Sequence, residues 1–188
     1  MRIISGIFKG KKIIEPKDNK TRPLKDLVKE SIFNIINHSN KFNIELNDAN
    51  ILDLFSGVGS FGLECLSRGA KYVVFFENYK EVLPILKKNL SNLRPLQNFE
   101  LIEKNVYDHL LPIDKNKKFN IIFLDPPYKD KNLKTVLNII KDKNILDTNG
   151  IVIIHRHKNE KEKFPPEYKV IEKKNYGLSK IIFLNILN

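Results

Sequence analysis

Apolar residues alternate along the chain between short runs and runs with helical spacing. The short, mostly apolar runs occupy residues 51–55, 72–76, 99–102, 119–124 and 151–155. Between them, apolar side chains return every three or four residues over about 60–68, 79–93 and 133–140, and a short helix is expected up to residue 111. Strands with little polar alternation are covered on both faces, so this rhythm predicts an α/β fold with a mostly parallel sheet and helices on both sides.

The two ends of the chain show other patterns. Residues 2–15 alternate like a β-hairpin with Lys9 and Gly10 as its turn, and helical spacing follows Pro23 as far as residue 37. A closing pair of strands is predicted at residues 169–174 and 181–186, which brings the predicted sheet to seven strands. We expect one domain over residues 1–188, in which residues 1–40 form a hairpin-and-helix extension and residues 50–188 form the core.

The run at residues 51–55 leads into a turn with three glycines spaced as G-x-G-x-x-G, namely Gly57, Gly59 and Gly62. Glycines let the chain turn sharply and approach a ligand closely, and Glu77 follows as it would in a dinucleotide-binding fold. Asp53, however, places a carboxylate just before the glycines. A pyrophosphate needs no anion beside it, whereas the sulfonium and ammonium groups of S-adenosylmethionine do. The turn therefore favours S-adenosylmethionine.

Polar side chains stand at or near the ends of four predicted strands, and these are Asp53, Glu77, Asn105 and Asp125. Ligands of such sheets bind at the carboxyl ends of the strands. We therefore expect the four residues to share one site.

Asp125-Pro126-Pro127-Tyr128 follows the fourth core run. Two prolines stiffen the loop and leave its carbonyl groups free to accept hydrogen bonds. Asp125 and the carbonyl of Pro126 can accept both N–H bonds of a planar amino group, which holds the nitrogen lone pair toward an incoming methyl group. Tyr128 offers a flat face on which a base can stack. The loop is thus typical of a site that methylates an exocyclic amine on a base turned out of its helix.

Charge points to a polyanionic partner. The net charge is +11 and the isoelectric point about 9.6, and residues 1–30 hold nine Lys or Arg against four Asp or Glu. We interpret the N-terminal part as a phosphate-binding surface, with a lysine-rich coding bias as the alternative. The single cysteine, Cys65, excludes an internal disulfide, and no apolar run has the ~18 residues of a membrane span. A cytoplasmic protein is expected.

The combination of D-x-F-x-G-x-G with D-P-P-Y resembles the amino-methyltransferases that use S-adenosylmethionine. Residues 2–12, 21–34, 55–64 and 125–128 also look like the bacterial 16S rRNA guanine-N2 methyltransferase family. The resemblance implies a Rossmann-like class I methyltransferase fold with a small basic N-terminal β-hairpin. It also implies S-adenosylmethionine as cofactor, S-adenosylhomocysteine as product, and a guanine of 16S rRNA as substrate, met in the small ribosomal subunit or an assembly intermediate.

The resemblance assigns roles to positions that match the family's motifs. The catalytic set would hold the guanine amine and consists of Asp125, Pro126, Pro127 and Tyr128. In the cofactor set, the glycine turn would surround the methionine part of S-adenosylmethionine, Glu77 would bind the ribose, and Asn105 and Val106 would flank the adenine. The full cofactor set is Asp53, Phe55, Ser56, Gly57, Gly59, Glu77, Asn78, Asn105 and Val106. The RNA-binding set is Arg2, Lys9, Lys11, Lys12, Arg22, Lys25 and Lys29.

Two positions depart from the family's pattern. An acid or amide is usual at the adenine contact, and Asn105 is the weaker choice. The family tends to carry an acid after the fifth strand, whereas this chain has His155-Arg156-His157, whose positive charge is available to RNA. No cysteine or carboxylate stands at ligand spacing from these histidines, so no metal is expected.

Other functions stay open at this point. The same chemistry would suit an amine of a DNA base or a glutamine amide in a protein. An NAD-dependent oxidoreductase would use the glycine turn and Glu77 but leaves Asp53 and Asp125 unexplained. A non-catalytic RNA-binding or ribosome-assembly protein rests on charge alone. A monomer is expected.

Overall fold

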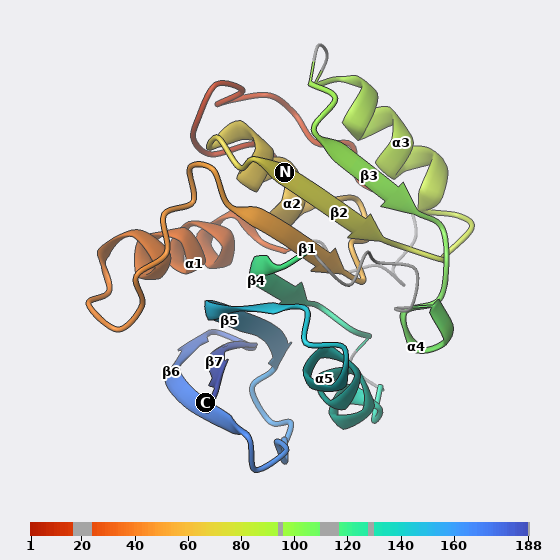
Figure 1. The fold of residues 1–188 in the computed structure, drawn as a ribbon. Coiled ribbons are helices and arrows are strands. Elements are labelled where there is room, and N and C mark those ends of the chain that lie inside the picture. Colours follow the sequence, from red (N-terminus) through yellow and green to blue (C-terminus); the bar gives the residue numbers. More distant parts are fainter. Residues whose placement is uncertain (17–23, 94–95, 110–116, 128–129, 188) are drawn as a thin grey trace.

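The computed structural model describes residues 1–16, 24–93, 96–109, 117–127 and 130–187. Figure 1 shows a central twisted sheet with helices packed around it. The strands are β1 (Asn50–Leu54), β2 (Tyr72–Phe76), β3 (Phe99–Ile102), β4 (Phe119–Leu124), β5 (Leu146–His157), β6 (Tyr168–Tyr176) and β7 (Ser179–Ile186). The helices are α1 (Asp26–His38), α2 (Ser60–Ser67), α3 (Leu83–Ser91), α4 (Val106–His109) and α5 (Leu133–Asp142).

The strand order across the sheet is β3-β2-β1-β4-β5-β7-β6 (Figure 1). The five strands from β3 to β5 are parallel, and β7 runs antiparallel to both of its neighbours. The predicted seven-stranded, mostly parallel sheet is therefore confirmed. Its order changes direction between β1 and β4, where an open sheet of this kind leaves a crevice for a ligand.

Both faces of the sheet are buried. Alternate residues of β4 point to opposite sides, so Ile121 and Phe123 join a core with α1, α2 and α3. Ile122 and Leu124 join a second core with α4 and α5. This arrangement explains the near-continuous apolar runs, because a strand covered on both sides has no solvent face for polar residues.

Two elements begin four or more residues away from the expected position. Helix α3 begins at Leu83 rather than at residue 79, because Pro84 cannot donate an interior helical hydrogen bond and sits in the first turn instead. Strand β5 begins at Leu146, ahead of the expected residue 151, and its pairing with β4 shifts register before Ile121. Gly150 lies in this irregular stretch, where an added Cβ would meet the Phe119 carbonyl at 2.9 Å.

The N-terminal hairpin is short and irregular. Arg2 and Lys12 form an antiparallel bridge, and backbone hydrogen bonds join Ile3 N to the Lys11 carbonyl at 2.9 Å and Gly10 N to the Ile3 carbonyl at 2.8 Å. The turn also packs against α2: Ile7 N donates to the Ser67 carbonyl at 2.8 Å, and at Gly6 (φ +82°) an added Cβ would lie 1.8 Å from that carbonyl. The alternation in the sequence reflects the burial of isoleucines such as Ile3, which is 2% exposed, against the core.

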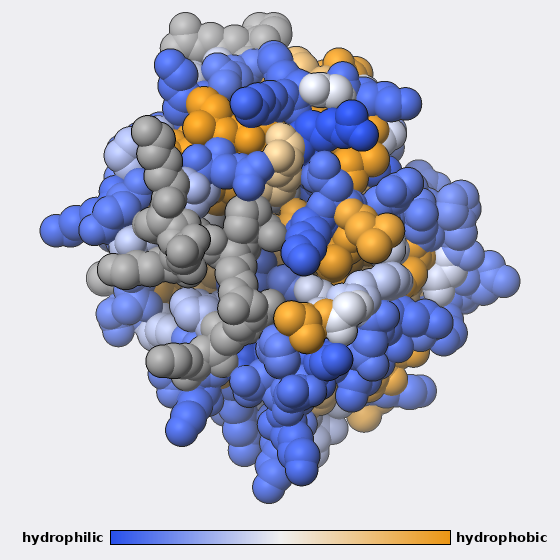
Figure 2. All heavy atoms as spheres, turned by 180° about the vertical axis from the view of Figure 1, so that it is seen from behind, coloured by the Kyte–Doolittle hydropathy of each residue, from blue (hydrophilic) through white to orange (hydrophobic). Residues whose placement is uncertain are grey.

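The surface is dominated by hydrophilic side chains. Figure 2 shows this on the face opposite to that of Figure 1, where hydrophobic side chains form small, separated groups. In the described part of the chain, no helix has the length and apolar character needed to cross a membrane.

Candidate active site

The glycine turn between β1 and α2 has a strained backbone. Phe55 adopts φ +62°, which is rare for a bulky side chain, and Gly57 and Gly59 adopt φ +55° and +84°. Ser56 anchors the turn, because its amide donates to the Phe76 carbonyl at 2.9 Å and its hydroxyl to the Asp53 carbonyl at 2.6 Å. The turn is thus held rigidly at the ends of β1 and β2.

The third glycine of the motif serves packing. An added Cβ at Gly62 would lie 2.2 Å from the Phe75 ring, so only glycine lets α2 approach β2 this closely. The Gly62 amide also donates to Asp53 Oδ2 at 3.0 Å. The helix therefore contributes both its close approach and one hydrogen bond to the site.

Asp53 is 1% exposed. Its Oδ1 has no hydrogen-bond partner among the described residues. Burial raises the pKa of Asp53 well above its ordinary value, the Gly62 amide opposes the rise, and the nearby Asp125 and Glu77 carboxylates add to it. A buried carboxylate with an unpaired oxygen suits a cationic group, and the ammonium and sulfonium of S-adenosylmethionine meet that requirement.

Glu77 ties the turn to the end of β2. Its Oε2 accepts the Gly57 amide at 2.7 Å, and its Oε1 accepts the amides of Asn78 and Tyr79 at 2.8 and 2.7 Å. The side chain is 8% exposed. Glu77 therefore fixes the backbone of the predicted cofactor loop.

Val106 begins α4, and Asn105 directly precedes it. Asn105 Oδ1 accepts the Tyr107 amide at 2.9 Å, which is a helix-initiating contact, and Val106 is 3% exposed in the core beside β1 and β2. The Tyr107 ring lies 5.9 Å from the Phe55 ring, so α4 is brought next to the glycine turn.

Asp125 follows β4 directly. Its amide donates to the Leu54 carbonyl at 3.3 Å, which places it beside the glycine turn, and its side chain is 20% exposed. Pro126 is buried, Pro127 is exposed, and Tyr128 lies outside the described residues. The structure thus brings Asp53, Glu77 and Asp125 to the same edge of three adjacent strands, as expected from their positions in the sequence.

Two residues of β5 contact the Asp125 loop. His155 Nδ1 lies 2.9 Å from Asp125 Oδ1, and Arg156 donates to the carbonyls of Pro127 at 3.3 Å and Asp130 at 2.9 Å. Each is 4% exposed. The expectation that they add positive charge for RNA is wrong, because both are buried against the loop. Sequence reasoning missed this role, although the departure from the family's acid was a signal.

Tyr107 also braces this loop and was not anticipated. Its hydroxyl donates to Asp130 Oδ2. Burial raises the pKa of Tyr107, and the neighbouring Asp130 raises it further. The phenol therefore stays protonated and continues to donate this hydrogen bond.

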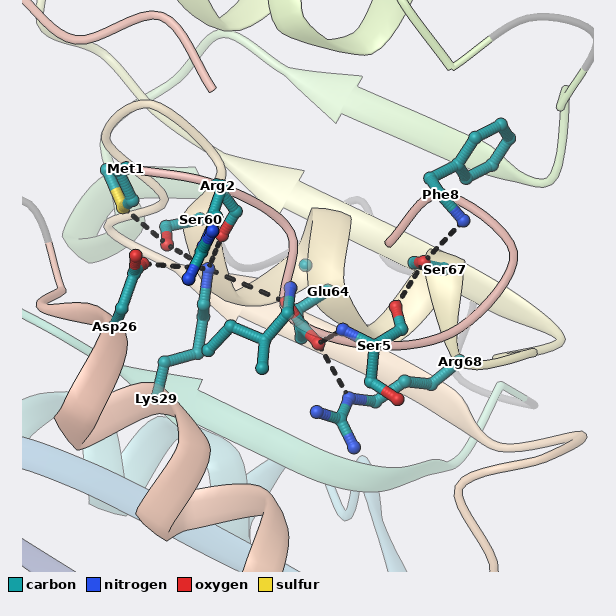
Figure 3. A network of polar contacts seen from close by, with 12 residues as sticks. Met1, Arg2, Ser5, Phe8, Asp26, Lys29, Ser60, Glu64, Ser67 and Arg68 are labelled. Carbon is teal, nitrogen blue, oxygen red and sulfur yellow. Dashed lines mark hydrogen bonds and ion pairs between the residues drawn. The ribbon is translucent and has the colours of Figure 1, made fainter. Parts of the chain in front are cut away.

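The basic N-terminal set divides into exposed and buried members. Those on the surface are Arg2, Lys9, Lys11, Lys12 and Lys25, while Arg22 lies outside the described residues. Lys29 is wrong as an RNA contact because it is 0% exposed. Its ammonium donates to the Arg2 carbonyl at 2.7 Å and lies 3.5 Å from Glu64, as Figure 3 shows. Lys29 instead holds the segment that carries the exposed cations.

Other features of the described residues offer no competing site. No cluster of three or more potential metal ligands occurs among them. A hollow of about 500 Å³ between α1 and β6 contains none of the predicted site residues, and it is lined by Ser31, Asn34, Ile35, His38, Ser39, Glu172 and Tyr176.

Comparison with known sequences identifies the family. The model of the family described as Conserved hypothetical protein 95 matches residues 1–185. The chain belongs to this family. It is 33% identical over 181 residues to the Putative rRNA methyltransferase YlbH of Bacillus subtilis, with 95% of each chain covered. It is 31% identical over 179 residues to the Ribosomal RNA small subunit methyltransferase D of Haemophilus influenzae, covering 95% of this chain and 90% of the relative.

Solved structures agree with the family's fold. A putative methyltransferase, yhhF, from Escherichia coli superposes with a TM-score of 0.82 at 28% identity, covering 99% of this chain and 97% of the other. A putative methylase, HI0767, from Haemophilus influenzae gives a TM-score of 0.78 at 29% identity, covering 100% and 99%. The expected Rossmann-like class I methyltransferase fold is confirmed.

Proposed function

We propose that this protein transfers a methyl group from S-adenosylmethionine to the exocyclic N2 amine of a guanine in 16S rRNA. The observation that carries the proposal is the buried, unpaired Oδ1 of Asp53, at the carboxyl end of the strand next to Asp125. Asp53 suits a cationic cofactor, and Asp125 suits an amine substrate. The names of the relatives support RNA as the substrate and the small ribosomal subunit as its setting.

The cofactor would lie against the turn from Asp53 to Gly59, with Glu77 at its ribose and Asn105 at its adenine. When bound, S-adenosylmethionine supplies an electrophilic methyl group. Asp53 would face its ammonium, and the rigid turn would exclude other positions of the ligand. The unpaired oxygen, the strained backbone and the close approach of α2 all support this assignment.

Asp125 would accept one N–H bond of the guanine amine and the carbonyl of Pro126 the other. These two acceptors would hold the nitrogen lone pair toward the methyl group that the cofactor supplies, and the proton that the amine loses would pass to solvent. No strong base is needed before attack, since the contribution of the residues is to position and polarise the amine. The exposed Arg2, Lys9, Lys11, Lys12 and Lys25 would bind RNA phosphates. The proposal includes a cytoplasmic monomer.

The test is a methyl-transfer assay with radiolabelled S-adenosylmethionine and small ribosomal subunits from a strain that lacks the activity. After digestion to nucleosides, label is expected in N2-methylguanosine. Label in another nucleoside would contradict the guanine assignment, and label in protein would favour a glutamine amide as the substrate. An enzyme that binds S-adenosylmethionine but labels nothing would contradict RNA methylation altogether.

Asp125→Ala separates binding from chemistry. We expect this variant to lose methyl transfer while its affinity for S-adenosylmethionine, measured by calorimetry, stays within about twofold of the wild type, since Asp125 is assigned to the amine. Retained transfer would show that Asp125 does not hold the amine.

A further inference from the structure

A chain of hydrogen bonds runs from the Asp125 loop into the sheet. Asp125 Oδ1 lies 2.9 Å from His155 Nδ1, and His155 Nε2 lies 2.9 Å from Ser179 Oγ. The three residues come from the end of β4, from β5 and from the first position of β7. His155 is only 4% exposed, whereas the Asp125 side chain is 20% exposed. The buried imidazole therefore stands behind a carboxylate that remains accessible.

This arrangement leaves the two oxygens of Asp125 unequal. Oδ1 is engaged by His155, whereas Oδ2 accepts no hydrogen bond from a described residue. A carboxylate on a loop can rotate about two side-chain bonds, and a hydrogen bond to one oxygen removes much of that freedom. Ser179 in turn fixes the imidazole at its other nitrogen, so the direction of Asp125 is set from the rigid sheet.

We propose that His155 is a positioning residue for methyl transfer: it holds Asp125 through Oδ1, with support from Ser179, so that Oδ2 faces the amine that accepts the methyl group. This inference rests on the proposed function. His155 touches neither cofactor nor amine, and it acts only through Asp125.

The charges around His155 favour this pairing. Burial lowers the pKa of His155, and the charge of Arg156, its neighbour on β5, lowers it further. The Asp125 carboxylate outweighs both effects, so that the pKa of His155 is raised. From β7 the imidazole meets the uncharged Ser179, while the ammonium of the adjacent Lys180 is paired with Glu162 at 2.8 Å. The imidazole thus donates from Nδ1 to Asp125 whether it is neutral or charged.

The experiment compares His155→Leu with His155→Asn in the ribosomal-subunit assay. Leucine fills the space without a donor, whereas the asparagine amide can donate from a position close to that of Nδ1. We expect His155→Leu to lower kcat about tenfold to about a hundredfold, which is the effect of one lost hydrogen bond to a charged group. KM for RNA and affinity for S-adenosylmethionine should stay within about twofold, and His155→Asn should recover most of kcat. His38→Leu, at an exposed histidine of α1, is the matched control.

Several outcomes overturn the inference. These are an unchanged kcat in His155→Leu, equal losses in the leucine and asparagine variants, or a loss confined to KM. If His155→Leu fails to fold, Ser179→Ala decides: a severalfold lower kcat at unchanged cofactor affinity supports the inference, and an unchanged kcat refutes it. Absence of transfer by the wild type would refute the proposed function itself, whereas wild-type transfer with an undiminished His155→Leu rate refutes only the role of His155.

Discussion

Asp53 retains a buried oxygen without a hydrogen-bond partner among the described residues. Leaving a buried polar atom unpaired costs free energy, and two further carboxylates, Asp125 and Glu77, make the ionised form still less favourable. Such a residue is poorly suited to stabilising the protein alone. Its properties are those of a group whose partner is a bound cation.

Asp53→Asn should weaken binding of S-adenosylmethionine by about tenfold or more, because asparagine keeps the size of the side chain but not its charge. The raised pKa of Asp53 predicts how binding depends on pH. Because a cation binds the ionised carboxylate, the affinity of the wild type for S-adenosylmethionine should rise with pH, whereas the affinity of Asp53→Asn should not change. Calorimetry measures both. Adenosine, which lacks both cationic groups, is the control ligand, and equal losses for the two ligands would contradict the assignment.

The His155–Asp125 pair should give a pH-dependent stability. Because the pKa of His155 is raised above 6.5 in the folded protein, its contribution is fully present below that value and is lost as pH rises through the folded pKa. In urea titrations, the difference in free energy of unfolding between wild type and His155→Asn should therefore be largest below pH 6.5 and shrink as pH rises above it. In an Asp125→Asn background the trend should reverse, since burial then dominates. A flat difference would show that the pair carries no charge.

At the scale of secondary-structure elements, the N-terminal segment, α1 and α2 meet at a junction of polar contacts that positions the exposed basic residues (Figure 3). Glu64 accepts the amides of Ile4 and Ser5 at 2.8 and 2.9 Å and the Arg68 guanidinium at 2.8 Å. It also lies 3.5 Å from the buried Lys29. One carboxylate on α2 thus holds two other segments, and with them the exposed cations.

Glu64→Ala should lower the free energy of unfolding by about 3–5 kcal/mol, because it removes the carboxylate that pairs with the buried Lys29 ammonium and accepts two backbone amides. Hydrogen exchange at Ile4 and Ser5 should speed up together. RNA affinity should also fall although no basic residue is removed. Lys134→Ala, at an exposed lysine of α5, is the surface control; unchanged exchange at Ile4 and Ser5 would contradict the role of Glu64.

Replacing Lys9, Lys11 and Lys12 together by alanine should reduce RNA affinity and its dependence on salt. Each lost phosphate contact removes about 0.7 to about 0.9 from the slope of log affinity against log salt, so three contacts remove about 2.1 to about 2.7. Filter binding at several salt concentrations measures the slope. As a control, replacing the exposed Lys71 and Lys134 by alanine should leave the slope unchanged. An unaltered slope in the triple variant would mean that Lys9, Lys11 and Lys12 do not bind RNA and that their charge reflects only the lysine-rich composition of the chain.

At the scale of the molecule, the N-terminal extension and the core share one interior. The Phe33 ring of α1 stacks on Phe61 of α2 at 5.4 Å, and Phe61 stacks on Phe123 of β4 at 4.1 Å. The described residues of segment 1–40 therefore pack into the core of the sheet rather than into one of their own, and we expect the whole chain to behave as a single domain.

Urea unfolding should accordingly show one transition by both circular dichroism and tyrosine fluorescence. S-adenosylmethionine at about 100 times its Kd should add about 2.7 kcal/mol to the free energy of unfolding, since only the folded protein forms the site. Inosine serves as the control, because it lacks the methionine part. Two separate transitions would contradict the single domain.

Much of this molecule follows from local sequence. The runs at residues 51–55 and 119–124 form strands because both faces of the sheet are covered. Gly57 and Gly59 mark the glycine turn because the backbone there has positive φ, and Gly62 is required because α2 packs closely on β2. The placement of Asp53 and Asp125 at strand ends follows from chain order and the geometry of parallel sheets. These features depend on periodicity and backbone sterics, which are encoded within a few neighbouring residues.

Only the tertiary structure decided the partners of individual side chains. Lys29 lies in a charged stretch of the sequence that predicts a surface position. In the folded protein it is buried beside Glu64, which follows thirty-five positions later. His155 and Asp125 come from different strands, and their contact depends on β4 and β5 being neighbours. Long-range pairings of this kind leave no periodic trace, because their energy arises from burial and charge at a single point in space. The sequence alone thus determined the fold and the placement of Asp53, Glu77 and Asp125 at one edge of the sheet, and the folded chain decided which groups contact them.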